Sequence, residues 1–200
     1  MSVRAEESPV KTAAATAGAV RTTEATARAG RLATLVRDIR LLLIALWLGG
    51  AVFFSATVAP SAFGVLRARK VAYANEAAGS IVTRTLGVVN TGGFVIALLL
   101  LLSAFLFRQE VKRFRFLAEV IALAILSVMT GINQWLIAAR MLSLRAAMGR
   151  PIDDVAADDP LRASFNALHG YSVTALGVAI IMAAVALLLI ARRGKADVRC

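Results

Sequence analysis

Four long apolar segments divide the chain. They are Leu41–Pro60, Thr91–Phe107, Phe116–Ile137 and Gly170–Ala191. A helix that spans a bilayer needs about 20 mostly apolar residues, because the hydrocarbon layer is ~30 Å thick and each residue rises ~1.5 Å. Each segment is close to this length, and a helix satisfies its own backbone hydrogen bonds in lipid. The pattern predicts an all-α fold, an integral membrane four-helix bundle.

The two longer connections, residues 61–88 and 138–168, also favour helical segments. The first has few helix breakers and carries apolar residues at helical spacing. In the second, Asp159 is a typical N-cap and Pro160 suits the first helical position. We therefore expect the fourth helix to begin at Pro160, before its apolar segment.

The ends of the chain differ from the rest. Residues 1–35 are rich in Ala, Thr and Arg with little bulky apolar content, which predicts a disordered or loosely helical basic tail. Residues 36–192 form the predicted four-span membrane domain, and residues 193–200 a second basic tail.

Composition agrees with a membrane protein, since 59% of residues are hydrophobic and 18% are charged, against about 25% charged in soluble domains. The net charge of +11 raises the question of nucleic acid. The Lys and Arg residues, however, flank apolar segments and do not cluster with base-stacking aromatic residues. The predicted partner is the lipid bilayer, with no nucleic acid.

Basic residues also predict orientation. They are dense before the first apolar segment, between the second and third, and after the fourth. Because Lys and Arg near helix ends favour the cytoplasmic side, we expect both termini in the cytoplasm and the chain in the plasma (inner) membrane. The two longer connections would then face outward.

Several polar residues fall at one depth in this topology, in the outer third of the bilayer. The predicted polar layer consists of Ser55, Asn90, Asn133, Gln134, His169 and Ser172. His169 is the only histidine, and it shares a helical stripe with Ser172 and a run of alanines. Such stripes of small residues face other helices in membranes, so we expect His169 to be buried against the third helix and bonded to Asn133 or Gln134. A ligand- or ion-binding role and proton transfer remain alternatives, because intramembrane ionisable groups are often functional.

Small residues predict close helix packing at four positions, Gly49, Gly50, Ala179 and Ala183.

Glu119 lies four residues after Arg115, which predicts a local ion pair near the interface. The aspartates of "PIDDVAADD" lack the ligand spacing of a calcium loop and predict a solvated acidic loop.

Two stretches, "WLGGAVFFSATVAPSAF" and "FNALHGYSV", resemble the transmembrane-protein-205-like domain, a small four-helix membrane domain of unknown function. The resemblance covers roughly residues 36–192 and implies the fold and a membrane location. Members of that family often carry an Asn after the H-x-x-S segment, where this chain has Thr174. The stretch from WLGG to Pro60 is also similar to copper-resistance membrane proteins, which use several His and Met residues.

The sequence favours a small, non-enzymatic, multi-pass membrane protein that binds or passes a small molecule or ion at the polar layer. A copper-handling membrane protein is the alternative. No catalytic residue, metal ligand or cofactor is predicted, because no nucleophile–base pair can be assembled and one His excludes bis-His haem within one chain. A homo-oligomer is compatible with the sequence.

Overall fold

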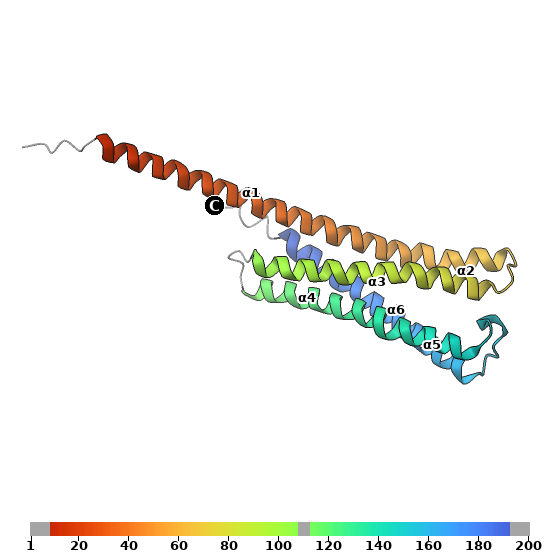
Figure 1. The fold of residues 1–200 in the computed structure, drawn as a ribbon. Coiled ribbons are helices and arrows are strands. Elements are labelled where there is room, and N and C mark those ends of the chain that lie inside the picture. Colours follow the sequence, from red (N-terminus) through yellow and green to blue (C-terminus); the bar gives the residue numbers. More distant parts are fainter. Residues whose placement is uncertain (1–8, 108–112, 193–200) are drawn as a thin grey trace, which may run out of the picture. The chain divides into compact units, whose positions relative to one another are not determined.

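The computed structural model describes residues 9–107 and 113–192. Every regular element in these ranges is helical (Figure 1). In chain order they are α1 (Pro9–Phe53), η1 (Phe54–Val58), α2 (Ala59–Ala68), α3 (Ala74–Leu106), α4 (Arg113–Gly131), η2 (Ile132–Ile137), α5 (Ala138–Met148), η3 (Ile152–Asp154) and α6 (Pro160–Ala191). By length and composition, four helices can cross a membrane: Gly30–Ala68, Ala74–Leu106, Arg113–Met148 and Pro160–Ala191. The predicted all-α membrane fold is confirmed.

The helical segments predicted in the two longer connections are extensions of the spanning helices. The first span continues through η1, a π-helical turn, into α2 and ends at Ala68. The third continues through the π-helical η2 into α5 and ends at Met148. The fourth begins at Pro160 as predicted, and Asp159 Oδ1 accepts a hydrogen bond from Leu161 N at 2.7 Å.

The chain divides into two compact units, Met1–Ile39 and Arg40–Cys200. In the first unit, residues 9–35 of the predicted tail are part of helix α1. Residues 1–8 and the predicted tail 193–200 lie outside the described residues. The predicted domain boundaries at 35/36 and 192/193 stay predictions.

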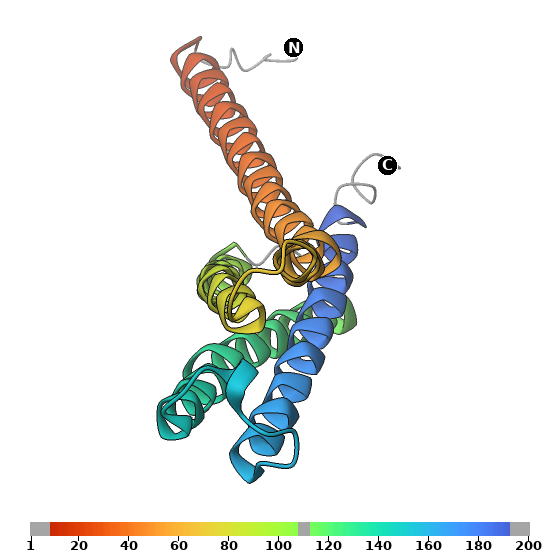
Figure 2. The same cartoon turned by 90° about the vertical axis from the view of Figure 1, so that its right-hand side faces the viewer.

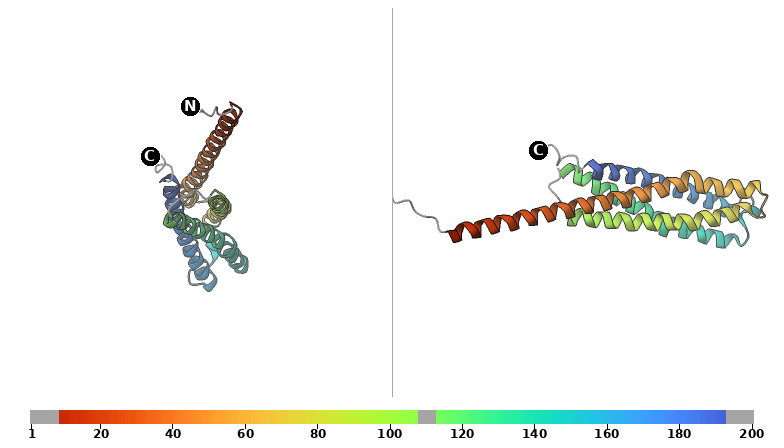
Figure 3. Two further views of the ribbon diagram at one scale, coloured as in Figure 1. Left: turned by 90° about the vertical axis from the view of Figure 1, so that its left-hand side faces the viewer. Right: turned by 90° about the horizontal axis from the view of Figure 1, so that it is seen from above.

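The core of the second unit lies where α3, α4 and α6 pack together, with Ile44, Trp47 and Ala51 of α1 against them. Its fully buried residues include Ile44, Leu123, Leu126, Ala179, Ala183 and Ala186. Because alanines leave little side chain between backbones, α6 approaches its neighbours closely. The right-hand view of Figure 3 shows the long helices of this unit running alongside one another.

Two helix pairs form the end of this unit that carries η3. There α2 packs on α3, and α5 packs on α6. Figure 2 views this end and shows the two pairs set apart, with η3 on the connection between α5 and α6. Direct contact between α3 and α5 is slight. This arrangement positions the site described next.

Candidate ligand-binding site

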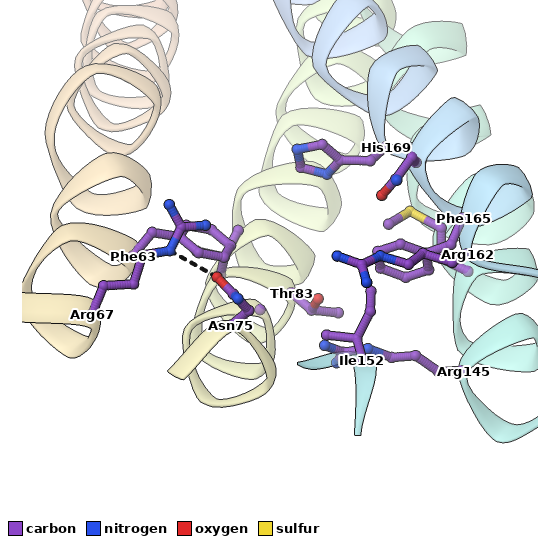
Figure 4. A pocket seen from close by; sticks show the side chains of 13 residues that line it. Phe63, Arg67, Asn75, Thr83, Arg145, Ile152, Arg162, Phe165 and His169 are labelled. Carbon is purple, nitrogen blue, oxygen red and sulfur yellow. Dashed lines mark hydrogen bonds between the residues drawn. The ribbon is translucent and has the colours of Figure 1, made fainter. Parts of the chain in front are cut away.

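A cavity of about 430 Å³ lies between the two helix pairs. Figure 4 shows side chains entering it from both sides, Phe63 and Arg67 from α2 and Arg145, Phe165 and His169 from α5 and α6. The volume falls within the ~300–1,000 Å³ range of small-molecule pockets. The full lining consists of Phe63, Arg67, Asn75, Gly79, Val82, Thr83, Met141, Arg145, Ile152, Arg162, Phe165, Asn166 and His169.

Three arginines dominate the polar lining. Arg67 Nε donates to Asn75 Oδ1 at 2.8 Å, and Arg162 Nη1 donates to the carbonyl oxygen of Val155. Both acceptors are neutral, so these hydrogen bonds do not cancel the guanidinium charges. Only Arg145 has an acidic partner among the described residues, since its Nη1 lies 3.3 Å from Glu76 Oε1. No carboxylate is among the residues that line the cavity.

A clasp around Asp153 ties the two helix pairs together. Asp153 Oδ1 accepts from Asn75 N at 3.3 Å and from Asn75 Nδ2 at 2.7 Å, and its Oδ2 accepts from Glu76 N at 2.9 Å. In return, Glu76 Oε2 accepts from Ile152 N at 3.1 Å. Residue Tyr73 at the start of α3 offers no side-chain cap, so Asp153 supplies that cap from the other side of the cavity. The prediction of a solvated acidic loop is therefore wrong at Asp153, which caps α3, whereas Asp159 caps α6 as predicted.

The stability that this clasp contributes depends on the charge of the Asp153 carboxylate. Burial raises the pKa of Asp153, but the hydrogen bonds from Glu76 N and from Asn75 outweigh burial and hold the pKa below its ordinary value. A carboxylate with a lowered pKa in the folded state stabilises the fold above its unfolded pKa of about 3.9, and this contribution is lost as the pH falls through the folded pKa.

We expect Asp153→Asn to lower the free energy of unfolding by about 1 kcal/mol at neutral pH, the usual effect of losing a helix cap. Thermal melting of the purified protein in a non-ionic detergent measures this. Below pH 4 the difference between variant and wild type should shrink. Asp154→Asn, at an exposed neighbouring position, is the control and should melt like the wild type. A pH-independent difference would contradict a role for the carboxylate charge.

The cavity continues inward as a deeper part of about 230 Å³, lined by α3, η2, α5 and α6. Its polar lining consists of Thr83, Asn90, Gln134, Arg145, His169 and Ser172. The rest is mainly apolar: Val82, Leu86, Trp135, Ala138, Met141, Leu142 and Phe165. Four residues of the predicted polar layer thus line one cavity.

The floor of the deeper part is a contact between three helices. Asn133 Nδ2 donates to Asn90 Oδ1 at 3.4 Å and to the carbonyl oxygen of Ser172 at 3.3 Å. Asn90 is 1% exposed, and its Nδ2 has no hydrogen-bond partner within the described residues. The same holds for Gln134 Oε1. A buried polar group without a partner costs about 1–3 kcal/mol, so this contact between the helices is not fully satisfied by the described residues.

The profile of the family described as "Domain of unknown function (DUF4149)" matches residues 42–150. The chain belongs to the DUF4149 family. The match includes α2, α3, η2 and α5, and therefore one helix pair and half of the other. No curated protein matches the chain, and no solved structure does.

Two polar-layer predictions need correction in this DUF4149 protein. His169 is exposed at the cavity wall instead of buried, and no hydrogen bond joins it to Asn133 or Gln134 in the described part of the chain. Ser55 is also exposed, and its hydroxyl donates to Ala51 O of its own helix at 2.8 Å. Ser55 follows the start of η1, where the wider π-helical turn shifts which residues face the bundle.

The predicted glycine packing is wrong for Gly49 and Gly50. Both are exposed, and a Cβ built on either would meet no atom within 4 Å. The close approach of this helix is made instead by Trp47, and a Cβ at Gly93 of α3 would lie 2.7 Å from its ring. Trp47 Nε1 also donates to Val89 O at 2.8 Å. Trp47 appears in the sequence as part of the WLGG stretch, but nothing there indicates its partner on α3.

A buried ion pair at the opposite end of the DUF4149 bundle was also missed. Arg40 Nη2 lies 2.5 Å from Glu119 Oε1 and donates to the carbonyl oxygen of Leu100 at 3.3 Å. Arg40 is 5% exposed and Glu119 is 1% exposed. The sequence predicted Arg115 as the partner, because spacing within a helix is visible in sequence and a contact between helices is not. Within the described residues, no group of three or more His, Cys, Asp or Glu side chains could hold a metal ion.

Proposed function

We propose that this DUF4149 protein binds a small molecule that carries an oxyanion group, a carboxylate or a phosphate, in the cavity between its two helix pairs. One observation carries the proposal. Arg67 and Arg162 both line the cavity, and the described partners of both are neutral oxygens. Guanidinium groups form strong, often two-pronged hydrogen bonds with carboxylates and phosphates, so an oxyanion would balance their charge.

A panel of oxyanion compounds tests the proposal. Thermal melting of the purified protein in a non-ionic detergent would be measured with inorganic phosphate, glycerol phosphate, acetate and dihexanoyl phosphatidylglycerol. A compound present at about 100 times its dissociation constant should raise the melting temperature by roughly 5–10 °C. The combined Arg67→Gln and Arg162→Gln variant should lose the increase. If no compound raises the melting temperature, or if the variant responds like the wild type, the proposal is wrong.

We propose that the cavity faces the outside of the plasma (inner) membrane, with both termini in the cytoplasm. The basic residues at both ends of the chain and around residues 108–115 support this orientation. A membrane-impermeant thiol reagent applied to intact cells should label a cysteine placed at Asp154 and spare one placed at Arg113, with Cys200 replaced by serine in both. The reverse pattern would invert the orientation.

We also propose kinship with the transmembrane-protein-205-like domain. The stretches Trp47–Phe63 and Phe165–Val173 support it. The first contributes Trp47 to the core and Phe63 to the cavity. The second contributes Phe165 and His169 to the cavity wall. Thr174 stands where that family often has Asn, and it is exposed and donates to Gly170 O of its own helix at 3.0 Å.

A further inference from the structure

We infer that the bound molecule is an anionic phospholipid from the surrounding bilayer, with its phosphate beside Arg67, Arg145 and Arg162 and one acyl chain in the deeper part of the cavity. The inference rests on the proposed oxyanion-binding function and narrows it to one class of ligand.

The first argument is that the mouth of the cavity, where Arg67, Arg145 and Arg162 lie, is continuous with a deeper part that is mainly apolar. The two parts of the cavity share six lining residues, which are Val82, Thr83, Met141, Arg145, Phe165 and His169. Beyond them, the deeper part is lined mainly by apolar side chains. A molecule that fills both parts must therefore combine an anionic group with an apolar chain.

The second argument is the position of the deeper part within the spanning helices. It lies between α3 and α5, which make little direct contact with each other. Trp135 and Leu142 line it and are 52% and 55% exposed. In a membrane-spanning helix, large exposed apolar side chains of this kind contact lipid. An acyl chain could therefore enter from the bilayer while its headgroup stays at the cavity mouth.

The third argument is the geometry of the mouth. Arg67 approaches from α2, and Arg145 and Arg162 approach from the opposite helix pair (Figure 4). Arg145 and Arg67 each place the guanidinium 5.6 Å from the centre of an aromatic ring, Phe165 and Phe63 respectively. These contacts hold the guanidinium planes at the cavity wall. A zwitterionic headgroup would bring its own ammonium group toward the same arginines, and like charges repel, so an anionic headgroup fits better.

Native mass spectrometry of the full chain tests the inference. The protein would be released from a non-ionic detergent after addition of equal amounts of dioleoyl phosphatidylglycerol and dioleoyl phosphatidylcholine. We expect one phosphatidylglycerol to be retained about 10-fold more than phosphatidylcholine, because both lipids carry the phosphate but only phosphatidylcholine brings an ammonium group toward the arginines. Retention of both lipids to the same extent would overturn the inference.

Matched variants locate the site. The combined Arg67→Gln and Arg162→Gln variant should retain the two lipids equally. Arg84→Gln combined with Arg140→Gln removes the same charge from exposed positions on α3 and α5 that do not line the cavity, and it should keep the preference. If both double variants lose the preference, the lipid binds through general surface charge and the inference is wrong.

A third variant tests the acyl chain. Ala139 is exposed and lines the deeper part, so Ala139→Trp should fill that part without disturbing the core, as an unchanged melting temperature would verify. It should lower phosphatidylglycerol retention and leave any stabilisation by glycerol phosphate intact. Stabilisation by glycerol phosphate as strong as by phosphatidylglycerol would overturn the lipid inference and leave the proposed function standing. Absence of an effect from either compound would overturn both.

Discussion

Replacing Arg40 with methionine should lower the free energy of unfolding by about 3–5 kcal/mol, the usual effect of removing one partner of a buried ion pair. The substitution takes away the guanidinium that lies 2.5 Å from Glu119 Oε1, and Glu119 is 1% exposed. A carboxylate at such a site then loses its cationic partner in surroundings of low polarity. Chemical or thermal unfolding in detergent, followed by circular dichroism, measures the loss.

A second substitution separates charge from packing. Arg40→Met combined with Glu119→Leu removes both charges and keeps comparable volume, and replacing a whole buried pair in this way is often close to neutral. The double variant should therefore recover most of the lost stability. Arg37→Met is the matched control, because Arg37 pairs with Asp38 at the surface and surface pairs contribute about 0–1 kcal/mol. If the double variant is less stable than Arg40→Met alone and less stable than Glu119→Leu alone, the loss of stability does not come from the unpaired charge.

Trp47→Ala should cost about 3–5 kcal/mol, the range for truncating a large buried aromatic residue. Trp47 is 7% exposed, it packs in the cluster with Ile44 and Leu100, and its Nε1 donates to Val89 O at 2.8 Å. The substitution leaves a cavity and removes that hydrogen bond. The same unfolding measurement checks it, and a loss below 1 kcal/mol would mean that the first span does not depend on this contact.

The glycine that accommodates Trp47 gives a sharper test of the geometry. A Cβ at Gly93 would lie 2.7 Å from the indole ring, whereas a Cβ at the adjacent Gly92 would lie 3.9 Å from it. Gly93→Ala should therefore destabilise the protein by about 1–3 kcal/mol through overpacking. Gly92→Ala should be neutral or slightly stabilising, because alanine favours helix more than glycine does. Equal effects at the two positions would contradict the packing of Trp47 against Gly93.

Sequence reasoning succeeded where one helix determines the answer. The apolar segments predicted the four spans, and Asp159 followed by Pro160 predicted the start of α6, because both signals are local. Asn90, Gln134 and Ser172 of the predicted polar layer line one cavity, and their common depth in the membrane stays a prediction.

The failures concern contacts between helices. Small residues at Gly49 and Gly50 suggested a packed face, but the rotation of the helix about its axis is decided by its neighbours, and here Trp47 and Ala51 face them. Arg40 and Glu119 lie 79 residues apart, so no spacing rule joins them. The cavity likewise depends on two helix pairs that separate beyond the core.

The separation of Arg40 from Glu119 has a consequence for biosynthesis. With a separation of 79 residues between the partners and synthesis at about 5–20 residues per second, Arg40 precedes Glu119 by roughly 4–16 s. During that interval Arg40 has no carboxylate from α4, and its long side chain can keep the charge among the lipid headgroups. The first helix would then reach its final depth only after the third has been inserted, so assembly of the bundle finishes well after the first span enters the membrane.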